Sequence, residues 1–173
     1  MYDLCNQNQR HHVSKVPQTP LICSVGKGRF GLEANVGFPL FNKVIRVAID
    51  EGGNIEFAQR CADFLNSMSN KLIQELCEAS IRYCNYHLEW IGQTRREFTK
   101  STDVLQTICP NVLIVPFLPA SADPVIHVES NCDWEEEHGL EWIVRNKDVL
   151  YIGPWNGLDP MGGFSEKVFY NHA

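Results

Sequence analysis

The order in which two hydrophobic periodicities follow each other constrains the fold of this chain more than any other sequence feature. Residues 30–36 and 45–49 alternate apolar with polar or small residues, as half-buried strands do. Residues 57–68 and 72–91 instead place apolar residues three or four positions apart, as amphipathic helices do. Strand-like runs return at 112–117, 125–129, 140–145 and 149–152. This order predicts an α+β fold, with an antiparallel or mixed sheet and a helix pair packed on one face.

The ends of these elements carry local signals of their own. Asn54 stands before the first helical pattern as a helix N-cap, and Gly92 follows the second one as a stop signal. Tyr83 and His87 lie on the apolar stripe of the second pattern, so we expect both to pack against the sheet. The last two strand patterns are separated only by residues 146–148, which predicts a hairpin.

The chain divides into two unequal parts by composition. Residues 1–29 are rich in Asn, Gln, His, Pro and Lys, and we interpret them as an irregular N-terminal leader. Residues 30–173 carry all the periodic patterns and predict a single α+β domain. The total length of 173 residues suits one domain that buries a full hydrophobic core.

Composition favours some classes of protein over others. No run approaches the roughly 18 apolar residues that a membrane-spanning helix needs, and the N-terminus is polar. The seven cysteines are an odd number with no Cys-x-x-Cys pair, which indicates free thiols. We therefore expect a cytoplasmic protein without membrane contacts. A net charge of −6 argues against nucleic acid as a partner, and no cofactor motif is present, so none is expected.

The negative charge is concentrated near the C-terminus. Residues 129–148 contain seven acidic and two basic side chains, a local net charge of −5. We interpret 133–138 as one helical turn in which Asp133 is the N-cap, paired with Glu136, and Gly139 ends the turn. Trp134 would anchor this turn underneath. The carboxylates would then point outward into water.

Two functions are compatible with this segment. The first is a protein-interaction surface for a basic partner, formed by six residues: Asp133, Trp134, Glu135, Glu136, Glu137 and His138. The second is a metal-dependent hydrolase or metal-binding domain that uses Asp133, Glu137 and His138, because carboxylates and imidazoles are ligands for divalent metals. No phosphate loop, nucleophile elbow or His-Glu-x-x-His motif accompanies them. We therefore assign no catalytic residues.

The segments 124–129, 132–142 and 149–153 together resemble a family of uncharacterised bacterial domains that share a Trp-x-x-Glu-His-Gly core. In this chain the core motif is Trp134 to Gly139, with Glu137 and His138 between them. The resemblance implies a small cytoplasmic α+β domain of unassigned activity. Some relatives are suspected immunity proteins, which neutralise toxins. The family brings no catalytic residues.

Overall fold

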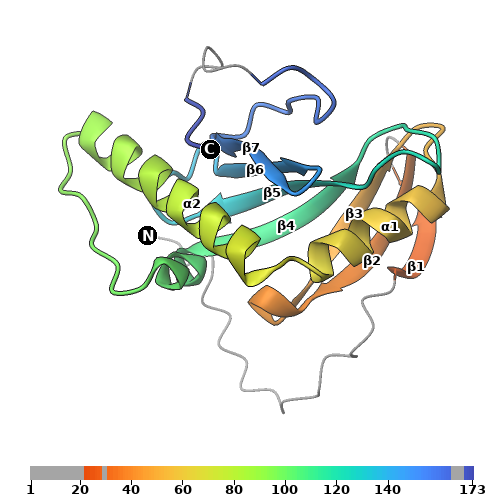
Figure 1. Cartoon of the computed structure of the whole chain (residues 1–173), viewed down its shortest axis with the longest axis horizontal. Helices are drawn as coiled ribbons and strands as arrows, with labels where there is room; N and C mark the ends of the chain where they lie inside the picture. Colours follow the sequence, from red (N-terminus) through yellow and green to blue (C-terminus); the bar gives the residue numbers. More distant parts are fainter. Residues whose placement is uncertain (1–21, 29–30, 165–169) are drawn as a thin grey trace.

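The computed structural model describes residues 22–28, 31–164 and 170–173. Its seven strands form one sheet, and their order in space is their order along the chain (Figure 1). The strands are β1 (Ile22–Lys27), β2 (Gly31–Phe38), β3 (Lys43–Asp50), β4 (Ile108–Val115), β5 (Val125–Cys132), β6 (Leu140–Arg145) and β7 (Asp148–Gly153). The helices are α1 (Ile55–Asn66) and α2 (Asn70–Trp90), with 3-10 turns η1 (Pro39–Phe41) and η2 (Ser101–Thr107).

The sheet is mixed, as predicted. Neighbouring strands are antiparallel except β3 and β4, which are parallel and paired from Arg46 with Val112 to Ile49 with Val115. Parallel neighbours need a long crossover, and here it consists of α1, α2 and η2. Along the chain, the helices therefore come after the first three strands and before the last four.

The strand β1 lies inside the segment that we predicted to be an irregular leader. It pairs antiparallel with β2, from Ile22 opposite Val36 to Lys27 opposite Leu32. Its apolar run is short, so periodicity alone gave a weak signal; pairing with an exposed edge of β2 stabilises it. The predicted boundary at residue 30 is therefore too late. Residues 1–21 of that leader lie outside the described residues.

Helix α1 begins where the sequence predicts. The Asn54 carboxamide oxygen accepts hydrogen bonds from the backbone N–H groups of Glu56 and Phe57, at 2.7 and 3.2 Å. Helix α2 has Ser69 as its N-cap, whose hydroxyl accepts from Leu72 N. It ends before Gly92, which has a φ of +74°. Side-chain capping of otherwise unpaired N–H groups explains both starts.

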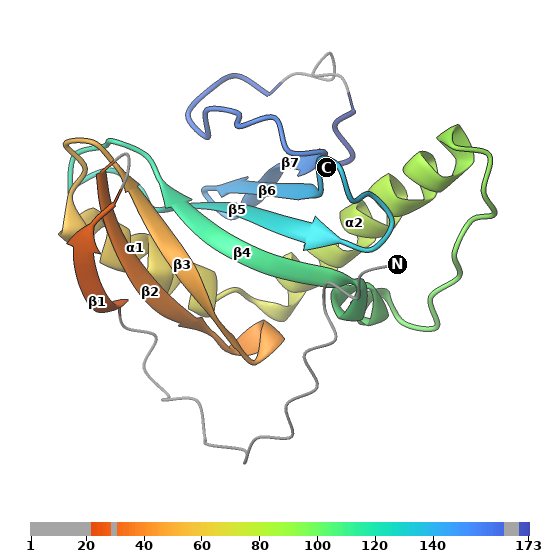
Figure 2. The ribbon, with the colours of Figure 1, turned by 180° about the vertical axis from the view of Figure 1, so that it is seen from behind.

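The main core is one hydrophobic cluster to which both helices and strands β2 to β7 contribute. Alternate residues of β2 and β3 are buried there, together with one face of α1: Ala34, Val36, Phe38, Ile45, Val47, Ile49, Phe57, Ala58, Cys61, Ala62 and Leu65. Figures 1 and 2 show α1 crossing these strands, whereas the C-terminal end of α2 projects beyond the sheet. Helix α2 instead contacts β7 and η2. Packing of the two helices as one layer stays a prediction.

Strand β6 is buried on both faces. Leu140, Trp142 and Val144 of β6 join the main core, and the indole N–H of Trp142 donates to the Ser80 hydroxyl of α2. The opposite face is covered by residues 154–164, which follow β7. The predicted hairpin of β6 and β7 turns at Asn146 and Lys147, both with positive φ as in a type I′ turn.

Within the described part of the chain, neither α1 nor α2 has the length and apolar character that crossing a membrane requires.

Candidate functional site

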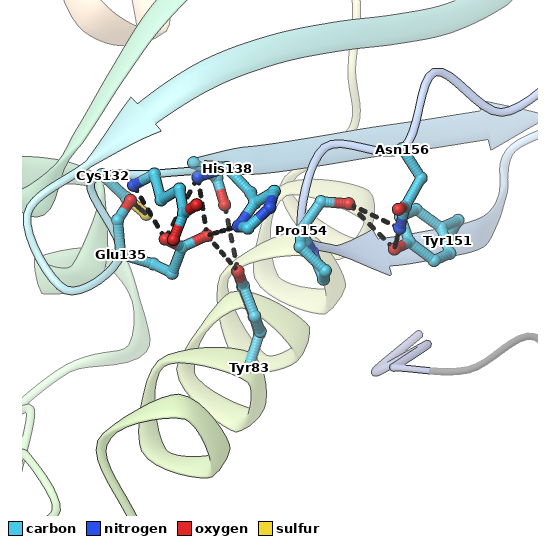
Figure 3. Close-up of polar contacts among 9 residues, drawn as sticks. Tyr83, Cys132, Glu135, His138, Tyr151, Pro154 and Asn156 are labelled. Atoms are coloured by element: carbon cyan, nitrogen blue, oxygen red, sulfur yellow. Dashed lines mark hydrogen bonds and ion pairs between the residues drawn. The ribbon is translucent and has the colours of Figure 1, made fainter. Parts of the chain in front are cut away.

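The turn between β5 and β6 is organised around one buried carboxylate. Glu135 is 6% exposed, and its oxygens accept hydrogen bonds from the backbone N–H groups of Glu137 and His138, at 2.8 to 3.1 Å. The Tyr83 hydroxyl of α2 shares its one proton between the Gly139 carbonyl, at 3.1 Å, and a Glu135 oxygen, at 3.4 Å (Figure 3). These contacts fix the turn to the helix.

This arrangement corrects the predicted one. Residues 133–138 form a hydrogen-bonded turn and no helix, and the capping carboxylate belongs to Glu135. Asp133, the predicted N-cap, pairs instead with Arg96 at 2.6 Å. The sequence could not distinguish the two acids because Tyr83, which selects Glu135, lies 52 residues away along the chain. Gly139 does end the turn in the left-handed region, with φ of +67°.

The six residues of the predicted acidic surface fall into two groups. Trp134 and Glu135 are buried, and Trp134 packs edge-on against Tyr83 as the predicted anchor. The other four are exposed: Asp133, Glu136, Glu137 and His138. Among the described residues no three potential ligands gather where they could hold a metal ion. The structure therefore does not bring Asp133, Glu137 and His138 together as one ligand set.

A cleft of about 300 Å³ opens beside this turn. One wall is the C-terminal half of α2, which contributes Tyr86, His87 and Trp90. The turn contributes Glu137 and His138 to the lining, and Tyr83 and Glu135 also line the cleft. Pro154, Asn156 and Tyr170 complete the lining. A concave site with aromatic walls and a few polar groups is the usual form of a ligand or side-chain pocket.

The sequence pointed to only part of this cleft. It singled out the turn residues, but it placed Tyr83 and His87 on a packing stripe and gave Tyr86 and Trp90 no role. Trp90 is 74% exposed and Tyr86 is 42% exposed. The available sequence signal for Tyr86 and Trp90 was that both are large aromatic residues near the end of a helix. The apolar stripe of that helix was already wide, so two more aromatic residues did not indicate a separate site. Only the path of α2 past the sheet shows that they face a cleft.

Burial controls the titration of the groups behind the cleft. Loss of solvent, followed by the nearby Glu135 carboxylate, raises the pKa of Tyr83 far above its usual range. Tyr83 therefore remains a neutral hydrogen-bond donor. Burial, followed by the positive charge of Arg82, lowers the pKa of His172 to about 4. The His172 ring lies against Tyr83 and Tyr86, with ring centroids 5.4 and 5.0 Å apart.

A second polar centre lies under residues 154–158. His127 Nε2 and Glu141 Oε1 are 2.7 Å apart, and both side chains are buried. Glu141 also accepts from the backbone N–H groups of Asn156 and Leu158, each at 3.0 Å. Trp155 stacks on the His127 ring. Sequence reasoning missed this pair because its members lie diagonally on adjacent strands, where the register of β5 against β6 decides their distance.

Residues 25–160 match the family model described as Domain of unknown function (DUF6985). The chain belongs to this family. The match extends from β1 through all later strands and both helices to the segment covering Glu141. The predicted resemblance to an uncharacterised domain family is confirmed at this level. The Trp-x-x-Glu-His-Gly signature, the bacterial source and the immunity relatives stay predictions. Comparisons with curated proteins and with solved structures give no match.

The His172→Phe variant is expected to lose less free energy of unfolding than the wild-type protein when the solution is made acidic. Because the folded-state pKa of His172, about 4, lies below its ordinary value of 6.5, the unfolded chain binds this proton first. The wild-type protein should therefore lose stability through His172 as pH falls from 6.5 to 4. Phe keeps a ring against Tyr83 and Tyr86 but has no proton to bind.

The measurement is urea unfolding of both proteins at several pH values between 4 and 7. The wild-type protein should lose more free energy of unfolding than His172→Phe over this range. Parallel curves would mean that His172 is not shielded from solvent behind the cleft.

Proposed function

We propose that this domain is a non-enzymatic protein-interaction module that binds a basic partner through the cleft and the exposed acids beside it. The observation that carries the proposal is the composition of the cleft wall. Its lining combines Tyr86, His87 and Trp90 with the carboxylates of Glu135 and Glu137, and includes no Lys or Arg. Exposed aromatic residues are typical of protein-binding surfaces, and a surface of one charge sign favours partners of the other.

The nearby cations are engaged away from the cleft. Arg96 pairs with Asp133, Arg95 with Glu89, and the Arg82 side chain donates to the His172 carbonyl. They hold the surrounding segments together and leave the negative charge of Glu136 and Glu137 on the surface. Complementary charge of this kind speeds association and disfavours acidic partners, including nucleic acid.

A more specific form of this proposal is an immunity role. Toxins that act on nucleic acid present basic surfaces, and an acidic cleft with aromatic walls would bind such a surface. Support comes from the charge of the 129–148 segment and from the contribution of its turn to the lining of the cleft.

The alternative, a metal-dependent hydrolase or metal-binding domain, has less support. It needs Asp133, Glu137 and His138 to act on one ion, whereas Asp133 pairs with Arg96. No described group of three or more potential ligands adds to that set. Side chains that are held apart would have to rearrange before they could bind one metal.

Selection from a display library of random 12-residue peptides tests the interaction proposal. The full chain is immobilised, and the Trp90→Ala variant serves for counter-selection. We expect the recovered peptides to be enriched in Lys and Arg, and their affinity to fall as salt is raised. Phe117→Ala is the matched control, because Phe117 is 67% exposed and does not line the cleft. Recovery of no peptide, or of acidic or uncharged peptides, would reject the proposal.

A further inference from the structure

Resting on the interaction function proposed above, we infer that the cleft is a specific receptor for one arginine side chain of the partner. The inference concerns the cleft alone and goes beyond general attraction to a basic surface. It follows from which carboxylate is available to a ligand, which rings are exposed, and how much room they leave.

The two carboxylates of the cleft have different tasks. Both oxygens of Glu135 are occupied, by the backbone N–H groups of the turn, by the Tyr83 hydroxyl and by the His138 ring, whose Nδ1 lies 3.3 Å from Oε2. Glu135 therefore supplies negative charge from a buried position, where solvent screens it weakly. The exposed Glu137 side chain has no hydrogen bond or ion pair among the described residues, so both of its oxygens remain open to a ligand.

The same cleft is also lined by rings of α2. Trp90 contacts the His87 ring, with centroids 6.1 Å apart, and most of its indole surface remains open to solvent. His87 in turn contacts Tyr83 edge-on at 6.4 Å. These contacts restrict the rings in the free protein, so less side-chain conformational entropy is lost when a ligand binds. A cation over an exposed Trp face gains about 0.5–1 kcal/mol, and more when water is excluded.

Arginine fits this combination better than lysine. Its guanidinium is planar and weakly hydrated, so it stacks on an aromatic face and simultaneously donates two parallel hydrogen bonds to a carboxylate. The lysine ammonium is a compact, strongly hydrated charge that does neither. A volume of about 300 Å³ lies at the small end of ligand pockets and suits one side chain. The cleft therefore selects the shape of the cation as well as its charge.

Three peptides that differ in one residue test this inference. The probes are acetyl-Gly-Gly-Xaa-Gly-Gly-amide with arginine, lysine or citrulline as Xaa. Citrulline keeps the planar shape of arginine and removes its charge. Binding to the full chain is measured by titration calorimetry and by the fluorescence of Trp90, with Trp90→Ala as the blank. We expect the arginine peptide to bind at least about tenfold more tightly than either of the others, equivalent to 1.4 kcal/mol.

Two acidic neighbours provide a matched pair of variants. Glu137→Gln should weaken binding of the arginine peptide about tenfold, as expected when one charge-assisted contact is lost. Glu136→Gln is the control: Glu136 lies on the same turn, is exposed, and does not line the cleft. Glu136 belongs to the acidic surface outside the cleft, which a peptide with one arginine tests only through long-range charge, so Glu136→Gln should change the affinity less than twofold. Urea unfolding of both variants checks that they remain folded.

The outcomes separate this inference from the proposed function. Equal binding of the arginine and lysine peptides, or equal effects of Glu137→Gln and Glu136→Gln, would overturn the arginine receptor while leaving attraction to basic partners intact. Absence of binding by all three peptides would overturn it as well. If the library selection also yields no basic peptide, the interaction function itself is rejected.

Discussion

Replacing Glu141 by Ala is expected to lower the free energy of unfolding by about 3–5 kcal/mol, as removal of one member of a buried ionisable pair does. Glu141 is fully buried, on the face of β6 that residues 154–164 cover. Its carboxylate is the acceptor for His127 and for the backbone N–H groups of Asn156 and Leu158. Without it, the buried His127 ring and two partly buried backbone N–H groups lose their acceptor at once, and the unpaired buried ring carries a desolvation cost.

The matched control for this change is Glu129→Ala. Glu129 lies directly opposite Glu141 in the register of β5 and β6, but it is only partly buried and contributes no hydrogen bond from its side chain among the described contacts. We expect a change within about 0.5 kcal/mol, as for most surface substitutions. Chemical unfolding in urea measures both variants. Similar losses for the two would show that Glu141 does not organise its surroundings.

A second measurement distinguishes local from global effects of Glu141→Ala. Glu141 holds residues 156 and 158 by their backbone, and Trp155, which precedes them, covers the His127 ring. In the variant, limited proteolysis within 154–164 should become faster than cleavage elsewhere, because this segment loses its attachment first. Uniform acceleration across the chain would instead indicate general destabilisation. Since Pro154 and Asn156 line the cleft, binding of the arginine peptide should weaken in parallel.

The sequence was sufficient for most of the elements because their signals are local. Alternation over 45–49, the Asn54 cap and the stop at Gly92 each depend on a few adjacent residues, and the structure has the corresponding elements. Strand β1 departs from this rule. It depends on pairing with β2 more than on its own composition, so its residues were assigned to the leader.

The candidate site was harder to predict because long-range contacts decide it. The sequence located the turn at 133–138. It wrongly predicted that the Glu135 carboxylate points into water, because the burial of Glu135 depends on Tyr83 of α2. It also missed the pair of His127 and Glu141, whose distance depends on strand register. Likewise, Trp90 is exposed because α2 projects past the sheet (Figure 1). Each error concerns two segments that are brought together only by folding.

Gly139→Ala is expected to cause the second large loss of folding stability, because the substitution is unfavourable for two separate reasons. A non-glycine residue in the left-handed region costs about 1–2 kcal/mol, and Gly139 has a φ of +67°. In addition, a Cβ at this position would lie 2.4 Å from the backbone oxygen of Ser130. Overlap in a closely packed region adds about 1–3 kcal/mol, because the backbone must shift.

Gly92→Ala separates these two costs. Gly92 also has positive φ, at +74°, but a Cβ there would meet no atom within 4 Å. This variant should lose only the conformational part, about 1–2 kcal/mol. The difference between the two variants in urea unfolding therefore measures the close approach of the turn to β5. Equal losses would show that the turn moves at little cost.

The same pair of variants tests whether the turn positions the cleft. Shifting Gly139 moves its carbonyl, which accepts from Tyr83, and with it the adjoining His138 and Glu137. Gly139→Ala should therefore weaken binding of the arginine peptide at temperatures where the variant is still fully folded. Gly92→Ala should not, because Gly92 does not line the cleft. Unchanged affinity in folded Gly139→Ala would mean that the cleft recognises its ligand through α2 alone.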